Sequence, residues 1–442
     1  MKKVLVLGAG LVSRPLVHYL LDQKNIHVTM ASRTKEKAIR IIADHPHGQA
    51  QGLNVSNHAE LDSLICDHDV IVSLLPYTYH VEVAQICLKY GHHLVTTSYV
   101  SDEMSKLHAP AEDADILFLN EIGLDPGIDH MSAMKIIHQL QGNGEKIVSF
   151  TSYCGVLPAP EANTNPVGYK FSWSPRGVLL ASRNSAQYLW DGQEVTIPGE
   201  HLFQGYTYQN IPGFGVLEGY PNRNSVLYRD LYGLLGVQTL QRGTLRYMGW
   251  CELMKKIGDM GLLSLTETPL PEDTTYRHYI SNLTGLPQET LESSLAEYLH
   301  IDTYAAVMKK LDWLDLFSTQ PVPPSATTPL DVLATRMLEK LQYGPGERDM
   351  SVLHHDFTAT STEGTNQVTS TFIGYGDPRG DSAVARTVAL PAAIGTKLLL
   401  QDKLSLRGVR IPIYPEIYMP VLHELESHGI VFKEHTQKVA PA

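Results

Sequence analysis

The sequence predicts an α/β fold that begins with a parallel sheet covered by helices on both faces. Short apolar runs alternate with helical patterns in the first part of the chain, which is typical of repeated β-α units. The first apolar run leads directly into a glycine-rich turn and then into a helical pattern. A chain of 442 residues is about three times as long as a typical domain, so two or three domains are expected.

The glycine-rich turn predicts a dinucleotide site of the Rossmann type. Val4–Leu7 is a continuous apolar run, as in a parallel strand buried on both faces. Residues 8–13 follow as Gly-Ala-Gly-Leu-Val-Ser, and a second strand is expected at Ile26–Ala31 after the helix. In this context the glycines let the backbone approach a pyrophosphate at the N-terminus of the helix. Ser13 replaces the third glycine of the motif and is still small enough for close packing of helix against strand.

The end of the second strand indicates which dinucleotide binds. Sites for NAD usually have Asp or Glu here to bind the ribose 2′-hydroxyl, whereas this chain has Ser32-Arg33-Thr34. A guanidinium between two hydroxyl groups suits a 2′-phosphate, because it donates two hydrogen bonds and neutralises charge. The alternative is that Arg33 only begins a solvated helix, since Lys35 and Lys37 follow it. We favour NADP(H).

Further strands of the same sheet are expected at Asp69–Leu75, His93–Tyr99 and Ala114–Leu119, with a helix at Val81–Leu88. Ligands of open α/β sheets bind at the carboxyl ends of the strands. We therefore expect one group of residues to converge there: Leu75, Thr97, Ser98, Tyr99 and Asp125.

Composition excludes several classes of partner. Lys and Arg number 35 and Asp and Glu 47, a net charge of −12 with a pI near 5.9, which argues against nucleic acid and anionic membranes. The four cysteines contain no C-x-x-C pair, so we expect no disulfide scaffold, no metal site and a reducing, cytoplasmic environment. The apolar run at Val4–Leu7 is too short for a signal peptide, and no stretch approaches the ~20 apolar residues of a membrane span.

Several longer blocks resemble the saccharopine reductase family, the NADP-dependent, L-glutamate-forming saccharopine dehydrogenases. The resemblance covers essentially the whole chain. Its blocks are Leu75–Tyr77, Thr97–Tyr99, Asn120–His130, Ser152–Gly155, Leu157–Glu161, Asn165–Ser174, Arg176–Leu180, Tyr220–Arg223 and Arg242–Tyr247.

The resemblance implies a reaction, a set of domains and an assembly. In the family, the amine of L-glutamate condenses with the aldehyde of 2-aminoadipate 6-semialdehyde, and NADPH reduces the imine to saccharopine. The implied domains are a variant Rossmann domain (1–126 and 390–442), a mixed α/β substrate-binding and dimerisation domain (127–242 and 345–389) and a small all-helical domain (243–344). A homodimer is implied as well.

The residue patterns agree with this arrangement. A strand is expected from Lys146, and residues 158–221 are rich in Gly, Pro and Asn, which indicates turns and short strands. Leucines at helical spacing run from Tyr247 to Tyr343. Residues 351–373 alternate around a turn, as in a hairpin, and amphipathic helices are expected at Leu390–Leu400 and Ile417–Leu425.

The resemblance also assigns roles to residues. On the cofactor side these are Gly8, Gly10, Leu11, Val12, Ser13, Ser32, Arg33, Thr34, Asn54, Val55, Leu75, Thr97, Ser98, Asp125 and Ser174. On the substrate side they are Ser98, Tyr99, Asp125, Arg223, Thr244, Leu245 and Arg246. Saccharopine carries three carboxylates, and each of the two substrate arginines can hold one in a bidentate pair.

The proton-transferring group remains open among three candidates, Asp125, Tyr99 and Cys154, because each lies in a matching block and can titrate or donate. Asp125 has an alternative role as a turn residue before Pro126, and Cys154 as a small buried apolar residue. Positioning of the reactants could also supply most of the rate without a single essential acid.

Two other functions compete with the leading hypothesis. One is a condensing dehydrogenase of the carboxyspermidine type, whose pocket should offer carboxylates to a cationic amine, whereas Arg223 and Arg246 indicate an acidic substrate. The other is a non-catalytic NADP-binding regulator. Retention of both the cofactor turn and the substrate arginines argues against it.

Overall fold

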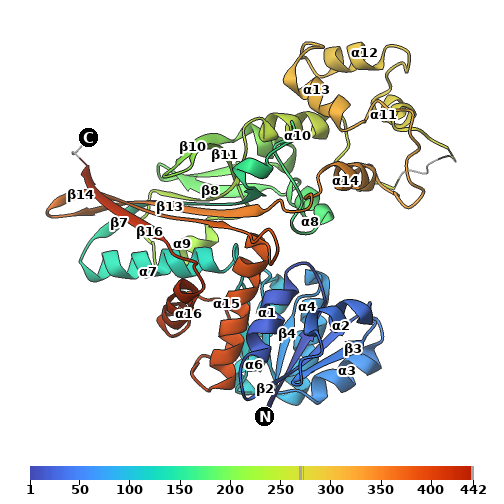
Figure 1. Cartoon of the computed structure of the whole chain (residues 1–442). Coiled ribbons are helices and arrows are strands. Elements are labelled where there is room, and N and C mark those ends of the chain that lie inside the picture. Colours follow the sequence, from blue (N-terminus) through green and yellow to red (C-terminus); the bar gives the residue numbers. More distant parts are fainter. Residues whose placement is uncertain (268–270, 272, 440–442) are drawn as a thin grey trace. The chain divides into compact units, whose positions relative to one another are not determined.

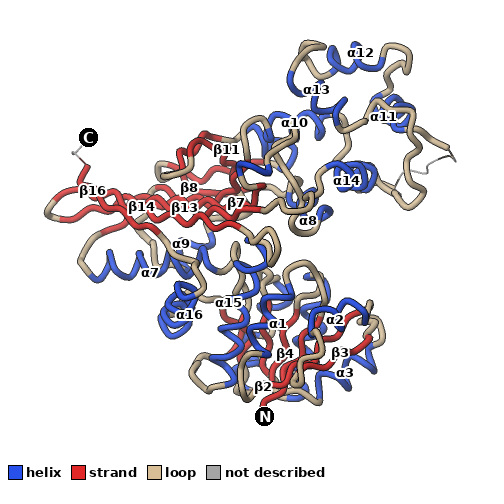
Figure 2. Tube along the Cα trace, in the orientation of Figure 1, coloured by secondary structure: helices blue, strands red, loops and turns tan. Residues whose placement is uncertain are grey.

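The computed structural model describes residues 1–267, 271 and 273–439, which form two compact units (Figures 1 and 2). Unit 1 comprises Met1–Lys146 together with Gly374–Lys433. Unit 2 comprises Ile147–Ile373 and the chain from Glu434 onward. The chain therefore leaves unit 1 after Lys146, returns to it at Gly374 and enters unit 2 again at Glu434.

Unit 1 is built on a parallel sheet of seven strands within the described residues, in the order β15-β6-β5-β4-β1-β2-β3. Its strands are β1 (Lys2–Leu7), β2 (Ile26–Ser32), β3 (Gly48–Gly52), β4 (Val70–Ser73), β5 (His93–Thr96), β6 (Leu117–Leu119) and β15 (Gly408–Arg410). The order 3-2-1-4-5-6 is that of the dinucleotide-binding fold, and the strand order reverses between β1 and β4. Val4–Leu7 is fully buried in the centre, as the apolar run predicts.

The helices of unit 1 are α1 (Ser13–Leu21), α2 (Lys35–Ile42), α3 (His58–Cys66), α4 (His80–Tyr90), α5 (Asp102–Ser105), α6 (His108–Asp113), α7 (Ile128–Gly142), α15 (Ala383–Leu400) and α16 (Pro415–Ser427). Helices α1, α2, α4, α6 and α15 pack against the strands of the sheet, whereas α7 packs against α16. A one-turn 3₁₀ helix, Tyr77–Tyr79, precedes α4. Helix α15 lies beside α1 and against β4 and β5, as Figure 1 shows, so the C-terminal part of the chain completes the layer that α1 begins.

Helix α15 is more apolar than the sequence analysis expected of any segment. Its 18 residues, Ala383–Leu400, are long and apolar enough by composition to cross a membrane, with a mean hydropathy of 1.4. However, 78% of the helix is buried inside the fold. It is apolar on nearly all sides because it packs between the sheet, α1 and α16, as a central core helix does.

Unit 2 contains a sheet of nine strands, seven of them in the order β10-β11-β12-β7-β13-β14-β16, with β8 beside β12 and β9 beside β8. Its strands are β7 (Lys146–Pro158), β8 (Ala186–Trp190), β9 (Gln193–Ile197), β10 (Thr207–Ile211), β11 (Gly215–Pro221), β12 (Thr239–Arg246), β13 (Asp349–Ser361), β14 (Gly364–Tyr375) and β16 (Lys433–Val439). Strands β7 and β12 are parallel, whereas β12 and β11 are antiparallel, so the sheet is mixed. Phe150 of β7 stacks on Phe357 of β13 in its core, with ring centroids 4.4 Å apart.

Helices of unit 2 fall into two groups. The short helices α8 (Pro175–Ala181) and α9 (Leu227–Leu231) and the 3₁₀ turns Pro160–Ala162 and Gly199–Gln204 lie within the loop-rich stretch. The others follow β12 as a helical segment: α10 (Trp250–Asp259), α11 (Tyr276–Thr284), α12 (Leu291–Tyr298), α13 (Ala306–Trp313) and α14 (Pro329–Lys340). Leu253, Ile257 and Leu295 are fully buried in a core that this segment shares with the strands.

The predicted fold class is confirmed: a Rossmann-like parallel sheet, a mixed-sheet part and a helical segment. The hairpin predicted in residues 351–373 corresponds to β13 and β14, which are joined by Thr362 and Glu363. Helix α15 begins seven residues before the predicted Leu390, at Ala383. Because the chain forms two compact units rather than three, the three-part division with boundaries at 126, 242, 344 and 389 remains a prediction.

Candidate cofactor and substrate sites

The residues predicted to bind the cofactor in unit 1 lie at the carboxyl edge of the parallel sheet. Gly8 follows β1, Ser32 ends β2, Leu75 lies just after β4 and Thr97 just after β5. Since the strands are parallel and in register, their carboxyl ends share one edge. The reversal between β1 and β4 is the position where this fold binds its ligand.

The glycine-rich turn is shaped for a pyrophosphate. Gly8 has φ +107°, and a Cβ there would lie 3.0 Å from the carbonyl oxygen of Leu74, so the position requires glycine. A Cβ on Gly10, in contrast, would meet nothing within 4 Å. The buried Ser13 hydroxyl (2.8 Å) and the Ser13 N–H (3.3 Å) both donate to the Gly10 carbonyl, and Val12 gives α1 no side-chain cap, so no capping side chain competes with an anion for this end of the helix. The neighbouring Leu11 is 69% exposed.

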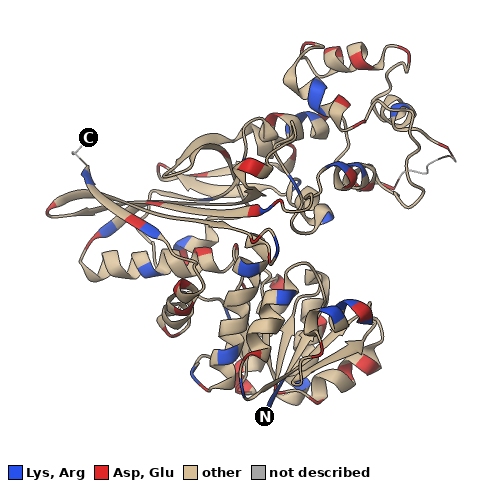
Figure 3. Cartoon of the chain, viewed as in Figure 1, with Lys and Arg blue, Asp and Glu red and all other residues tan. Residues whose placement is uncertain are grey.

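The adenosine side is more open. Arg33 is exposed, and in the described part of the chain it forms no ion pair. The Ser32 hydroxyl accepts a hydrogen bond from the Thr34 N–H (3.3 Å), which shapes the turn that carries this arginine. Asn54 follows β3, and its side-chain oxygen accepts from the Ser56 N–H (3.2 Å). In Figure 3 Lys and Arg are interspersed with Asp and Glu, so the chain has no single basic face in that view and cationic sites are local.

A buried histidine joins the ends of β4 and β5. The His80 ring at the start of α4 is hydrogen-bonded through Nδ1 to the Ser73 hydroxyl (2.9 Å) and through Nε2 to the hydroxyls of Ser98 (2.9 Å) and Thr96 (3.0 Å). Burial lowers its pKa to about 4, so the ring is neutral at physiological pH. The imidazole thus fixes the hydroxyl of Ser98, a predicted contact of both cofactor and substrate.

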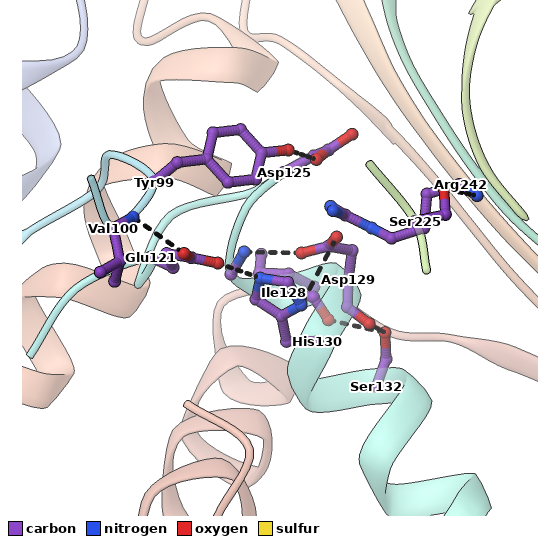
Figure 4. Close-up of polar contacts among 11 residues, drawn as sticks. Tyr99, Val100, Glu121, Asp125, Ile128, Asp129, His130, Ser132, Ser225 and Arg242 are labelled. Carbon is purple, nitrogen blue, oxygen red and sulfur yellow. Dashed lines mark hydrogen bonds and ion pairs between the residues drawn. The ribbon is translucent and has the colours of Figure 1, made fainter. Parts of the chain in front are cut away.

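Tyr99 and Asp125 form a hydrogen-bonded pair, drawn in Figure 4. The tyrosine hydroxyl donates to Asp125 Oδ1 at 2.7 Å. Asp125 lies in a tight turn in which the Gly123 N–H donates to the Pro126 carbonyl (2.9 Å). Both side chains are half-buried. The structure therefore brings two of the three predicted proton-transferring residues into direct contact.

The third candidate, Cys154, lies in unit 2 beside another predicted residue. It is paired in register with Thr244, on the parallel strands β7 and β12. Tyr220 of β11 lies opposite Thr244 on the other side. Cys154 is buried, at 7% exposure. Cys154, Thr244 and Tyr220 are therefore neighbours across three adjacent strands.

Arg246, at the end of β12, is a buried cation without a carboxylate partner among the residues that the structure describes. It is 6% exposed, its Nη1 donates to the Leu245 carbonyl (2.7 Å), and its Nε has no hydrogen-bond partner. Aromatic rings surround its guanidinium carbon, at 5.0 Å for Tyr169, 5.4 Å for Trp250 and 6.0 Å for Tyr220. Removing a guanidinium from water is costly unless it is paired, so this arrangement favours an anionic ligand.

The carboxylate nearest in register to Arg246 is used elsewhere. Glu218 lies opposite Arg246 in the β11–β12 pair, and it is 2% exposed. Its two oxygens accept from the backbone N–H groups of Gly249 (2.6 Å) and Cys251 (2.8 Å), at the N-terminus of α10. Glu218 therefore neutralises the start of a helix rather than the arginine.

The two remaining predicted residues have local roles in unit 2. Ser174 is the N-cap of α8, where its hydroxyl accepts from the Gly177 N–H (3.2 Å). Arg223 is exposed, in the loop after β11, with φ +54°, a conformation that non-glycine residues seldom adopt. Its carbonyl accepts from the Gln187 N–H (2.9 Å).

Sequence reasoning missed His80, Glu218 and the aromatic rings around Arg246. Glu121 belonged to a block of the resemblance but received no role. A signal existed for Glu121, which is the one charged residue in the run from Ile116 to Leu124. Within the described residues, no group of three or more His, Cys, Asp or Glu side chains could hold a metal ion.

Comparison with known proteins identifies the family. Residues 4–119 match the model of the saccharopine dehydrogenase NADP binding domain, and residues 123–430 match that of the saccharopine dehydrogenase C-terminal domain. The chain belongs to the saccharopine dehydrogenase family. Its N-terminal part is the NADP-binding domain of that family, in agreement with the cofactor expected from Ser32-Arg33-Thr34.

Relatives and a solved structure extend over the whole chain. The saccharopine dehydrogenases [NADP(+), L-glutamate-forming] of Schizosaccharomyces pombe and Saccharomyces cerevisiae are each 39% identical, and the alignments cover 98% of this chain and 99% of each relative. The mitochondrial alpha-aminoadipic semialdehyde synthase of Bos taurus is 38% identical over 98% of this chain but only 47% of its own length. The structure of the apo saccharopine dehydrogenase (L-Glu forming) of S. cerevisiae superposes with a TM-score of 0.89, covering 99% of this chain and 100% of that one.

The shape of the glycine-rich turn generates a first prediction. Gly10→Ala should fold normally, because an added Cβ meets nothing within 4 Å, but its methyl group will occupy the space expected for the pyrophosphate. We expect the NADPH dissociation constant to rise by at least about tenfold, a loss of ~1.4 kcal/mol, in a fluorescence titration. Gly142→Ala, at an equally open position in α7, is the matched control and should bind NADPH as the wild type does. NADPH binding unchanged in Gly10→Ala would contradict this placement.

The burial of His80 generates a second prediction. In NMR spectra of histidine-labelled protein, the ring signal that disappears in His80→Asn should titrate near pH 4, well below the ordinary 6.5. Since the folded state disfavours the protonated ring, its contribution to stability is complete above pH ~6.5 and is lost as pH falls towards 4. A midpoint near 6.5 would show that the ring does not have the buried environment described here.

Proposed function

We propose that this protein interconverts saccharopine with L-glutamate and 2-aminoadipate 6-semialdehyde, using NADP(H). The observation that carries the proposal is Arg246, a buried guanidinium that is surrounded by aromatic rings and has no carboxylate partner among the described residues. A ligand with carboxylate groups would supply the missing counter-charge. Membership of the family indicates saccharopine, which carries three.

Residues of unit 1 would hold the cofactor. The turn Gly8–Ser13 and the first N–H groups of α1 would bind the pyrophosphate, with Leu11 and Val12 alongside it. Arg33, between Ser32 and Thr34, would bind the 2′-phosphate, and Asn54 and Val55 would lie near the adenine. Bound NADPH supplies the hydride that reduces a C=N bond.

Further contacts of the cofactor would come from Leu75, Thr97, Ser98, Asp125 and Ser174. Of these, Ser98 has the most firmly set side chain, because His80 binds its hydroxyl while β4 and β5 fix the histidine. A hydroxyl that cannot rotate away is suited to orienting a reactive ring against its substrate.

Two arginines and two residues at the end of β12 would bind the substrate. Arg246 and Arg223 would each hold a carboxylate, and Thr244 and Leu245 would contribute hydroxyl and backbone contacts at the end of β12. Arg223 is exposed and would take a carboxylate by a charge-assisted pair, whereas Arg246 would take one away from water, where the interaction is stronger.

Proton transfer would involve the Tyr99–Asp125 pair. In the direction of oxidation, the carbon beside the secondary amine of saccharopine would give a hydride to NADP⁺ while the nitrogen loses its proton, which leaves an imine. Water then adds to the imine, and the C–N bond breaks to release L-glutamate and the aldehyde. Asp125 accepts a hydrogen bond from the Tyr99 hydroxyl in the structure, so as a carboxylate it can take a proton while the tyrosine keeps it oriented. Cys154, beside Thr244, is the remaining candidate for a proton donor.

The larger organisation is proposed on the same basis. We infer the three-part division into a Rossmann domain, a substrate-binding and dimerisation domain and a helical domain, together with a homodimer and a cytoplasmic location. Three leucines support an interface near α9: Leu227, Leu231 and Leu235 are all substantially exposed. Contiguous exposed apolar side chains are typical of surfaces that contact another protein.

One assay tests the proposed function directly. NADP⁺ reduction should be observed with saccharopine and not with a carboxyspermidine-type compound or with the cofactor alone. Arg223→Ala should raise the KM for saccharopine by on the order of 10- to 100-fold, because one charge-assisted pair is lost, while the NADPH dissociation constant stays nearly unchanged. Arg183→Ala, which removes another exposed arginine of unit 2 outside the predicted substrate residues, is the control. Absence of turnover with saccharopine would refute the proposal.

A further inference from the structure

The buried Glu121 forms hydrogen bonds with the backbone on both sides of Tyr99. The Glu121 N–H donates to the Ser98 carbonyl (3.1 Å), and one carboxylate oxygen of Glu121 accepts from the Val100 N–H (2.9 Å). Glu121 is only 5% exposed, and its φ of +56° is rare for a residue with a side chain. Such a conformation persists where surrounding contacts fix it, and it is frequent near reactive groups.

A buried histidine holds the other carboxylate oxygen. Glu121 Oε2 lies 2.8 Å from Nε2 of His130, whose side chain is completely buried in the first turn of α7 (Figure 4). One carboxylate therefore connects the segment Ser98–Val100 with the start of α7.

The start of α7 is also where Asp125 is anchored. The turn that carries Asp125 leads into α7, and the Gly127 N–H donates to Oδ1 of Asp129 (2.6 Å), which fixes the join. A Cβ on Gly127 would lie 2.1 Å from the Gly123 carbonyl oxygen, so this turn is closely packed and requires glycine. Glu121 thus reaches the Tyr99 segment directly and the Asp125 segment through His130.

We propose that Glu121 and His130 are positioning residues, which set the distance and direction of the Tyr99–Asp125 hydrogen bond. This inference rests on the proposed function, in which that pair transfers the proton. Neither Glu121 nor His130 needs to touch the substrate. The length of the Glu121 side chain matters more than its charge, because the carboxylate must contact both the Val100 N–H and the His130 imidazole.

Two conservative variants separate reach from charge. Glu121→Gln keeps the length of the side chain, so its amide oxygen can still accept from the Val100 N–H while its NH₂ group reaches Nε2 of His130. Glu121→Asp keeps the charge but is shorter by one methylene group, so it cannot make both contacts. The proposal predicts that the Gln variant retains kcat within about tenfold of the wild type, whereas the Asp variant loses on the order of 100-fold, as expected for a misplaced reacting group.

A double-mutant cycle shows whether the effect acts through Tyr99. Tyr99→Phe should lower kcat in the wild-type background and have little further effect in the Glu121→Asp background. The NADPH dissociation constant and the melting temperature, measured on every variant, establish that each is folded and binds cofactor. Glu424→Gln is the matched control, because Glu424 pairs with Lys397 (2.6 Å) in the same unit away from the strand ends. It should leave kcat unchanged.

The outcomes are distinct. If the wild type is active but Glu121→Gln loses activity while Glu121→Asp keeps it, the positioning role is wrong. Strictly additive effects of Tyr99→Phe and Glu121→Asp on kcat would also overturn it. A wild type that does not turn over saccharopine would overturn the proposed function and this inference together.

Discussion

The isolated burial of the Arg246 guanidinium is the constraint on which the second unit depends. A buried cation without a carboxylate partner is unfavourable, and among the described residues the Leu245 carbonyl and three aromatic rings offset only part of that cost. The neighbouring Glu218 is committed to the N-terminus of α10, so it cannot relieve the arginine. The Arg246 guanidinium is enclosed by the loop with Tyr169, the strands β11 and β12 and the first turn of α10. An acidic ligand would supply its counter-charge.

In the first unit, parallel strands and two buried histidines set the positions of the predicted cofactor residues. Parallel strands bring their carboxyl ends to one edge, and the residues that follow β1, β2, β4 and β5 therefore become neighbours. Two buried histidines then fix what the strands bring together. His80 holds the Ser98 hydroxyl, and His130 acts on the adjoining Tyr99 segment through Glu121.

Much of this arrangement could be predicted from the sequence, and the rest could not for physical reasons. The central strands of unit 1 are buried on both faces, so they appear as apolar runs such as Val4–Leu7, and the glycine turn follows from its spacing. The surroundings of Arg246 come from Tyr169 and Trp250, which lie on a loop and a helix whose approach no periodicity reveals. Glu121 accepts a hydrogen bond from the backbone N–H of Val100, and a bond of that kind leaves no pattern in the sequence.

Removing the Arg246 guanidinium and one substrate carboxylate in turn tests most directly whether this arginine binds that carboxylate. Calorimetric titration with NADPH bound would compare saccharopine with derivatives in which one carboxylate is an amide, in the wild type and in Arg246→Met. We expect one amide to bind the wild type on the order of 10- to 100-fold more weakly than saccharopine does, and Arg246→Met to bind the two equally. If Arg246→Met keeps the full affinity for saccharopine, or still discriminates against that amide, the guanidinium is not the receptor.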